Sequence, residues 1–207
     1  MNGKMMVNKA VKIEARPESI EIDLSRIALI IVDMQNVFAG RAEYSGIFKD
    51  SVKQTIRAIE QTKKLADAAR TAGVIVIYLR MMKDPERKGK SIIRSPQDTE
   101  IVDELTPLPG DIIVEKLRYS GFRETVLDEI LKSRNITHLI FTGTATNICV
   151  ESTLRDAYFL DYYPILVSDA TSSAGPSVTY EATLWNVEEV FGWVAATDDV
   201  INALNQK

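Results

Sequence analysis

The sequence predicts a single α/β domain with a doubly wound sheet of six parallel strands that is flanked by helices. Short apolar runs alternate with helical patterns along the chain, and the runs are apolar throughout instead of alternating with polar residues. No shift in composition marks a second domain. Continuous apolar runs are typical of parallel strands that helices cover on both faces, which is the Rossmann-like arrangement.

The elements follow one another in a regular order from residue 27 onward. Residues 1–26 carry mixed charge and weak periodicity, and we interpret them as an N-terminal arm that precedes a domain spanning residues 27–207. The run IALIIVD at 27–33 is the first predicted strand. The pattern from about Ser51 to Thr71 predicts an amphipathic helix, and Gly73 is a natural end for it.

The same alternation continues to the C-terminus. The remaining predicted strands are VIVIYL (74–79), DIIVEK (111–116), HLIFTG (138–143), YPILVSD (163–169) and GWVAAT (192–197). The predicted helices are RETVLDEILKSRN, NICVESTLRDAYFLD, SVTYEATLWNVEEVF and a last one at the C-terminus. The segment from Met81 to Pro109 has no clear pattern, and because loops of that length are uncommon in compact domains, we expect a functional loop or lid there.

The composition excludes several classes of function. A formal net charge of −4 gives no electrostatic reason to expect nucleic acid or an anionic membrane as partner. No run approaches the roughly 20 apolar residues that cross a bilayer, and the N-terminus does not resemble a signal peptide. The single cysteine cannot form an internal disulfide, which favours the reducing cytoplasm. We therefore expect a cytoplasmic protein whose partner is a small molecule.

Polar residues gather at the carboxyl ends of the predicted strands, where ligands bind in open α/β sheets. Asp33, Arg80 and Lys116 end the first three strands, and Cys149 follows the fourth. An acid, an amine and a thiol are therefore expected at one edge of the sheet. Asp169 ends the fifth strand, but it precedes Ala-Thr-Ser-Ser and is better interpreted as a capping residue.

Cys149 is the residue whose interpretation depends most on its context. A lone cysteine is more often a buried hydrophobic residue than a reagent. Here it lies in the first turn of a predicted helix that begins near Thr146 or Asn147, which are both good capping residues. The partial positive charge and unpaired N–H groups of a helix N-terminus favour a thiolate and can bind an oxyanion. The pattern therefore indicates a nucleophile.

Three motifs, IALIIVDMQNVF, VEKLRYSGF and TGTATNICVESTLRDA, resemble those of the isochorismatase-like cysteine hydrolases. They occur in the right order, each at a strand end, and the resemblance extends from about residue 27 to the end of the chain. Within this family, the stretches KLRYSGF, ATNICVESTLRDAYFLDYY, DATSSAGP and NVEEVFGWV resemble those of the ureidoacrylate amidohydrolases of pyrimidine breakdown. The resemblance implies a catalytic triad of Asp33, Lys116 and Cys149, a non-proline cis peptide at Ala145–Thr146, and no cofactor.

The implied reaction is hydrolysis of the C–N bond of a small N-carbamoyl (ureido) compound, with a thioester-type intermediate and release of ammonia. Asp33 is expected to accept the thiol proton and later to pass it to the departing amine, while Cys149 attacks the carbonyl carbon. Lys116 is expected to hold the carboxylate and the thiolate in register. The expected oxyanion donors are the backbone N–H groups of Cys149 and of the residues just before it, Ala145 and Thr146.

Three further residues are candidates for substrate contact, each with a structural alternative. Arg80 could pair with a substrate carboxylate, but a structural salt bridge is an equal alternative. Tyr119 lies on the turn after Lys116, where its hydroxyl could reach the substrate or its ring could simply pack. Gln35 could contact the substrate or hold its own loop.

No metal site is expected. The metal-dependent nicotinamidases of this superfamily use one aspartate and two histidines, whereas this chain has a single histidine, His138, at the start of a predicted strand.

Two other functions are alternatives to this reaction. An isochorismatase-type enzyme cleaves a vinyl ether on the same fold without a cysteine nucleophile, and a non-catalytic binding module would need no chemistry at all.

We also expect a homo-oligomer, because the stretch FGWVAA and the N-terminal arm offer apolar surface.

Overall fold

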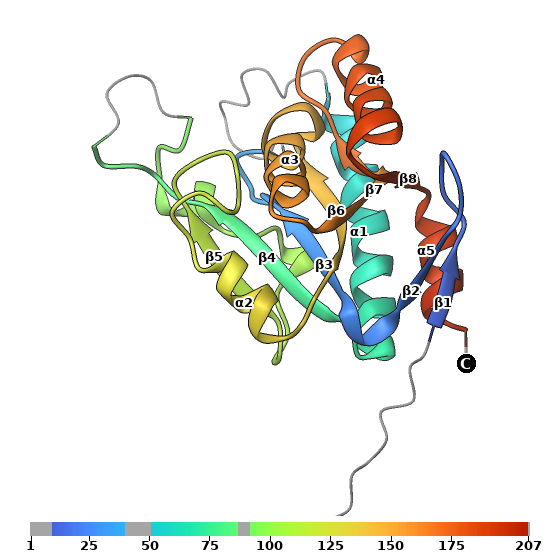
Figure 1. The fold of residues 1–207 in the computed structure, drawn as a ribbon. Helices are drawn as coiled ribbons and strands as arrows, with labels where there is room; N and C mark the ends of the chain where they lie inside the picture. Colours follow the sequence, from blue (N-terminus) through green and yellow to red (C-terminus); the bar gives the residue numbers. More distant parts are fainter. Residues whose placement is uncertain (1–9, 40–50, 87–91, 207) are drawn as a thin grey trace, which may run out of the picture.

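The computed structural model of the 207-residue chain describes residues 10–39, 51–86 and 92–206. These residues form a central sheet between two layers of helices (Figure 1). The strand order is β5-β4-β3-β6-β7-β8, and all neighbouring strands are parallel. The predicted doubly wound sheet of six parallel strands is therefore confirmed.

Each strand of this sheet overlaps one of the predicted apolar runs, but β4 continues to Met81, and β7 continues to Ser172 past Asp169, which was predicted to end it. The strands are β3 (Ile27–Val32), β4 (Ile75–Met81), β5 (Ile112–Lys116), β6 (His138–Thr144), β7 (Tyr163–Ser172) and β8 (Trp193–Ala195).

The helices lie within the predicted helical patterns, and some are shorter than expected. They are α1 (Val52–Ala72), α2 (Leu127–Ser133), α3 (Glu151–Phe159), α4 (Ser177–Asn186) and α5 (Thr197–Leu204). The predicted segment of α2 began before Glu124, whose φ of 58° lies in the left-handed region. A helix cannot pass through that conformation, so α2 begins after it.

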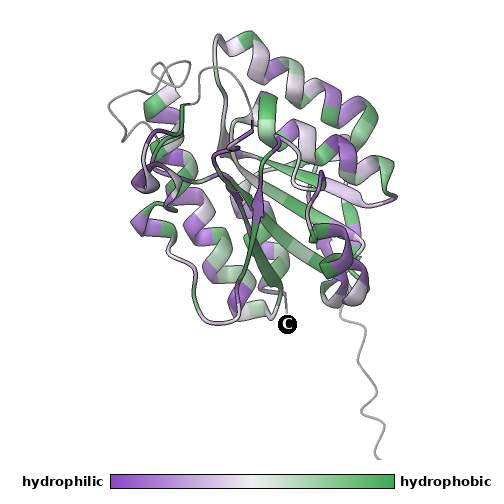
Figure 2. Cartoon of the chain, turned by 90° about the vertical axis from the view of Figure 1, so that its left-hand side faces the viewer, coloured by the Kyte–Doolittle hydropathy of each residue, from purple (hydrophilic) through white to green (hydrophobic). Residues whose placement is uncertain are grey.

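Both faces of the sheet are buried, which explains the uninterrupted apolar runs. In β3, Ile27, Leu29 and Ile31 pack with side chains of α1 and α5. The residues between them, such as Ala28 and Ile30, pack with α2 and α3 on the other face. In Figure 1, α2 and α3 cover the face turned to the viewer, and Figure 2 shows the hydrophobic strands between the mixed surfaces of the helices.

The described part of the predicted N-terminal arm forms an antiparallel hairpin of β1 (Ala10–Ile13) and β2 (Ile20–Asp23). It packs on its own chain, because Val11 and Ile13 belong to the core beneath α1 and α5. Arg16 and Val194 of β8 exchange two backbone hydrogen bonds of 2.9 Å. The weak periodicity of the sequence did not indicate this hairpin, and residues 1–9 of the arm lie outside the described ranges.

The order of the strands creates a switch point between β3 and β6. From β3, the chain adds β4 and β5 on one side and β6, β7 and β8 on the other. Gly143 permits the close contact of the two central strands, because it has a φ of 120° and a Cβ there would lie 2.1 Å from the carbonyl oxygen of Val32. In sheets of this kind, ligands bind beyond the carboxyl ends of the strands at such a point.

The long segment after β4 is partly anchored beside this point. It contains short 3₁₀ helices at Pro96–Thr99 and Asp103–Leu105. Residues 98–102 run along residues 34–37, and backbone hydrogen bonds of 3.0 to 3.3 Å join the two stretches. Residues 87–91 of the predicted lid lie outside the described ranges. Within those ranges, no helix is both long and apolar enough to cross a membrane.

Candidate active site

The carboxylate of Asp33 and the ammonium group of Lys116 form a buried ion pair where β3 and β5 end. Lys116 Nζ lies 2.7 Å from Asp33 Oδ2, and both side chains are 0% exposed. Nζ also donates to the carbonyl oxygens of Arg118 and Tyr119, each at 3.1 Å. These three acceptors use all three ammonium hydrogens, so the positive charge has a fixed position.

The backbone turns sharply at Asp33, directly after β3. Its φ is 48°, a left-handed conformation that aspartate tolerates better than most residues, and its N–H donates to Leu79 O at 3.0 Å. The second carboxylate oxygen, Oδ1, is buried and accepts no hydrogen bond of normal geometry from the described residues. The thiol of Cys149 lies close enough to this carboxylate for each group to shift the pKa of the other.

Cys149 belongs to a π-helical turn, Thr146–Val150, that joins β6 to α3. The carbonyl oxygen of Ala145 accepts hydrogen bonds from the N–H groups of Ile148 and Val150 and so starts the turn. The predicted side-chain cap is wrong, because neither Thr146 nor Asn147 caps the turn. Asn147 instead holds Ala174 after β7, through two hydrogen bonds of 2.9 Å to its backbone.

The non-proline cis peptide lies at Thr144–Ala145. The prediction placed it at Ala145–Thr146 and was therefore wrong by one bond. The N–H of Ala145 interacts with the thiol of Cys149, where it favours the ionised form. Ala145, Thr146 and Cys149, the three positions from which oxyanion donors were expected, are all buried.

Burial has the largest effect on the pKa values of Asp33 and Cys149. It raises the pKa of the Cys149 thiol well above the usual value, and the negative charge of Asp33 raises it further, against the weaker effects of Lys116 and Ala145. Burial also raises the pKa of Asp33, although Lys116 opposes this shift. Desolvation therefore acts against the expected preference for a thiolate, whereas the lysine and the turn act in its favour. These shifts favour a protonated thiol beside a carboxyl group that is placed to accept its proton.

Thr153 connects the two sides of the site and was not predicted. Its Oγ1 donates to the carbonyl oxygen of Cys149 at 2.7 Å and accepts the N–H of Gly121 at 3.0 Å. Gly121 follows the loop whose carbonyl oxygens hold Lys116. The sequence offered only a threonine four residues after the cysteine, which does not differ from an ordinary helical threonine that bonds to its own backbone.

Gln35 holds its loop, which is the structural alternative left open for it. Its amide nitrogen donates to the carbonyl oxygens of Met81 and Thr99, both at 2.9 Å, and its amide oxygen accepts the N–H of Met81 at 2.8 Å. Because these bonds occupy a fully buried side chain, Gln35 ties the residues after Asp33 to the end of β4 and to the long loop.

Arg80 and Lys116 lie on opposite faces of the sheet. The neighbours of Arg80 in β4, Leu79 and Met81, pack on the α2 and α3 side, so strand alternation turns Arg80 the other way. There it forms an ion pair with Glu115, its partner in the register of β4 and β5. This ion pair matches the structural salt bridge that was the alternative to substrate binding by Arg80. Tyr119 is half exposed on the loop after β5, and its carbonyl oxygen contributes to the position of Lys116.

Asp169 and His138, two other residues discussed from the sequence, both make structural contacts. Asp169 accepts hydrogen bonds from the N–H and the hydroxyl of Thr197, so it caps α5 and not the segment that follows it in sequence. His138 stacks on Tyr163 at the start of β6, and burial lowers its pKa to about 4. In the described ranges, no group of three or more His, Cys, Asp and Glu side chains could hold a metal ion.

The sequence and the structure were compared with known proteins. The family model of the isochorismatase domain matches residues 27–199. A ureidoacrylate amidohydrolase, RutB, of Cronobacter turicensis is 41% identical over 95% of this chain and 96% of its own length. The structure of a cysteine hydrolase from Pseudomonas syringae has a TM-score of 0.79 and 34% identity, over 88% of this chain and 94% of that one.

A second solved structure, of lower identity, is also named as an enzyme that hydrolyses an amide-type bond. An N-carbamoylsarcosine amidase from Thermoplasma acidophilum has a TM-score of 0.71 and 27% identity, over 84% of this chain and 97% of that one.

Proposed function

The chain belongs to the isochorismatase family, and we propose that it is a cysteine-dependent amidohydrolase that cleaves the C–N bond of a small N-carbamoyl compound. Ureidoacrylate, and with it a role in pyrimidine breakdown, is the first candidate because of the 41% identity to a ureidoacrylate amidohydrolase. The observation that carries the proposal is the buried pair of Asp33 and Lys116 beside the only thiol of the chain.

We propose that the reaction begins when Asp33 takes the proton of the Cys149 thiol. The raised pKa of both groups suits this step, because the thiol stays protonated until it attacks and a carboxylate of raised pKa is a better proton acceptor. The sulfur then attacks the carbonyl carbon of the terminal carbamoyl group. Lys116 keeps its contact with Asp33 and orients the carboxylate toward the sulfur.

The oxyanion of the tetrahedral intermediate would accept hydrogen bonds from backbone N–H groups of the turn, at Cys149 and at Ala145 or Thr146. Protonated Asp33 returns its proton to the departing nitrogen, ammonia leaves, and the acyl group stays bound to sulfur as a thioester-type intermediate. Water then attacks this intermediate, with Asp33 as its base, and the thiol is restored. The proposed cycle uses no cofactor.

The variant Cys149→Ala tests the covalent mechanism. We expect ammonia release from ureidoacrylate to fall by roughly 10³-fold or more, as happens when a nucleophile is removed. Activity near that of the wild type would contradict the mechanism, and a vinyl ether hydrolase of the isochorismatase type would then be the better proposal.

A panel of ureides and primary amides tests the substrate class. We expect carbamoyl compounds to release ammonia faster than simple amides of similar size. Turnover of a simple amide without turnover of any carbamoyl compound would contradict the substrate proposal. Binding of ureides without any turnover would favour the non-catalytic module.

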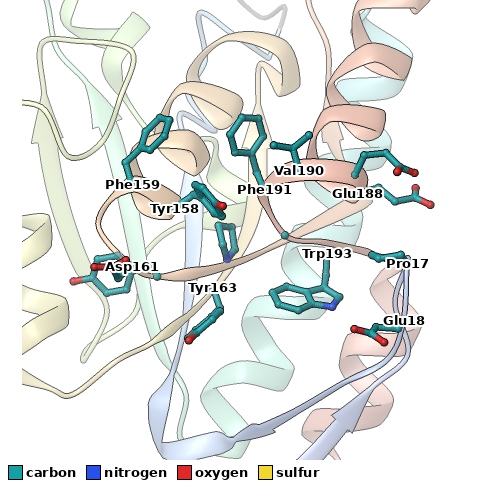
Figure 3. A pocket seen from close by; sticks show the side chains of 14 residues that line it. Pro17, Glu18, Tyr158, Phe159, Asp161, Tyr163, Glu188, Val190, Phe191 and Trp193 are labelled. Carbon is teal, nitrogen blue, oxygen red and sulfur yellow. The ribbon is translucent and has the colours of Figure 1, made fainter.

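We also propose that the protein works as a homo-oligomer in the cytoplasm, where its single thiol stays reduced. Aromatic side chains surround an open hollow of about 550 Å³ that the C-terminal end of α3 and the start of β8 share (Figure 3). Phe159 is 70% exposed there, and Phe159 and Tyr158 each contact the ring of Phe191 edge-on. Monomeric proteins rarely expose apolar patches of more than a few hundred Å².

Charged side chains also border this hollow. The guanidinium group of Arg155 lies 4.3 Å from the centre of the Phe191 ring, and acidic residues such as Glu189 and Asp161 line the same hollow. Interfaces are also enriched in aromatic residues and arginine. Of the predicted stretch FGWVAA, Trp193 lines the hollow, whereas Val194 and Ala195 are buried within the chain.

A further inference from the structure

The loop between β5 and Gly121 determines where the charge of Lys116 lies. Two of its carbonyl oxygens, at Arg118 and Tyr119, accept hydrogen bonds from Lys116 Nζ at 3.1 Å. Any displacement of this loop would therefore move the ammonium group relative to Asp33. The loop reaches α3 through the hydrogen bond from the N–H of Gly121 to the Thr153 hydroxyl.

The contact between this loop and α3 is tight. Thr153 is 0% exposed. A Cβ at Gly121 would lie 2.3 Å from Leu79 Cδ1 and 3.1 Å from Thr153 Cγ2, so only a glycine lets the loop come this close without a shift of its neighbours. The hydroxyl and the methyl group of one threonine therefore fix the distance of the loop from α3.

The hydroxyl of Thr153 also holds the nucleophile's turn, because it donates to the carbonyl oxygen of Cys149 at 2.7 Å. The contacts form a closed ring. From Cys149 it runs through Thr153 to the Gly121 loop, from this loop to Lys116, and from Lys116 through Asp33 back to the thiol.

We propose that Thr153 is a positioning residue, which keeps the turn of Cys149 in register with the loop that holds Lys116. This inference rests on the proposed function. Without the hydroxyl, the buried N–H of Gly121 would have lost its acceptor, and the loop would move to find another. Such a movement would carry the two carbonyl oxygens, and with them the ammonium group, away from their present positions. Displacements of about 1 Å can lower turnover by roughly 10²-fold.

The test compares Thr153→Val with Thr153→Ser and with a matched control, Thr62→Val. Thr62 is also 0% exposed, and its hydroxyl donates to a backbone carbonyl oxygen, that of Ala170, away from the site. We expect Thr153→Val to lower kcat on the order of 10- to 100-fold with a smaller change in KM. We expect Thr153→Ser to restore kcat to within a few-fold of the wild type, and Thr62→Val to keep it.

A second readout needs no substrate and therefore separates this inference from the proposed function. The rate at which iodoacetamide alkylates the only cysteine is measured against pH. In Thr153→Val, a displaced ammonium group favours the thiolate less, so the midpoint should move to higher pH, whereas Thr153→Ser and Thr62→Val should keep the wild-type midpoint.

The inference would be overturned by a folded Thr153→Val variant that keeps the alkylation profile of the wild type. It would also be overturned if Thr62→Val lost kcat and shifted the profile equally, since the effect would then reflect general stability. If no ureide is turned over by the wild type but the alkylation profiles still shift as described, the proposed function fails and the positioning role of Thr153 stands.

Discussion

At Asp33, one negative charge has two opposite effects on the thiol. In the resting site it raises the pKa of Cys149 and keeps the proton on sulfur. During attack, the same carboxylate is the proposed acceptor of that proton. A slow reaction of the resting thiol with an alkylating reagent is therefore compatible with a catalytic cysteine, and the charge on its neighbour must be varied to show its role.

Replacing Asp33 by asparagine separates the two effects. Asparagine keeps the shape of the side chain and tolerates the positive φ, but it has neither the charge nor the basicity. We expect ammonia release to fall by roughly 10²- to 10⁴-fold, because the general base is lost. We expect the midpoint of iodoacetamide alkylation to move to lower pH than in the wild type, because the charge that opposes ionisation is gone. The chain has one cysteine, so the mass increase of the intact protein measures this reaction alone.

The control for this experiment is Asp169→Asn. Asp169 caps α5, and its replacement should leave both the turnover and the alkylation midpoint unchanged. A midpoint that stays in place or rises in Asp33→Asn would show that the carboxylate does not act on the thiol.

Among the elements, β3 and β6 meet at a contact that only glycine allows. At Gly143 a side chain would meet the backbone of Val32, which cannot move aside as a flexible side chain could. At Gly110 the φ is similarly positive, 104°, but a Cβ would meet nothing within 4 Å. An alanine would therefore strain the backbone at both positions, but its Cβ would clash with neighbouring atoms only at Gly143.

We expect Gly143→Ala to destabilise the protein far more than Gly110→Ala. The control should lose about 1 kcal/mol from strain alone, and the variant at Gly143 several kcal/mol more, because β3 and β6 must separate. Urea unfolding at constant pH measures both values. Equal losses in the two variants would mean that the strands relax around the added carbon at little cost.

Sequence patterns could predict the strands because both faces of the sheet are buried and each strand is therefore a continuous apolar run. They could not predict the hairpin, since β1 and β2 are four residues each, and so short a stretch holds only two periods of the apolar–polar alternation. The same holds for the turn around Cys149, where Asn147 bonds to residues after β7 that lie far away in sequence.

The position of a residue at a strand end was predictable, but the face on which its side chain lies was not. Arg80 and Lys116 both come at strand ends, and only the register of β4 and β5 shows that they lie on opposite faces. Gln35 and Thr153 act through partners on other elements, so no local pattern in the sequence marks their contacts.

For the molecule as a whole, the aromatic hollow at the ends of α3 and β8 is the surface from which we predict assembly. Phe159→Glu would place a charge in the centre of the proposed interface. Val126→Glu is the matched control, because Val126 is also well exposed but lies just before α2, outside the hollow. We expect a wild-type mass that is a multiple of 23.1 kDa, a monomer for Phe159→Glu, and an unchanged assembly for Val126→Glu.

Light scattering after size-exclusion chromatography measures these masses over a range of concentrations. A wild type that stays monomeric at high concentration would contradict the proposal of a homo-oligomer. Dissociation of Val126→Glu together with Phe159→Glu would place the interface elsewhere.

The three oxygen atoms that accept hydrogen bonds from Lys116 also determine how the site responds to dissolved salt. Mobile ions screen charges that water reaches, such as the half-exposed pair of Lys63 and Asp67 on α1. They cannot enter the space between Lys116 and Asp33, because the two charged groups lie 2.7 Å apart and both side chains are 0% exposed in the resting site. The site therefore has its own permanent counter-ion, held by covalent attachment to β5, and the electrolyte outside neither supplies nor removes it. Concentrated salt can rearrange the charges on the surface of this protein while the field at the thiol stays the same.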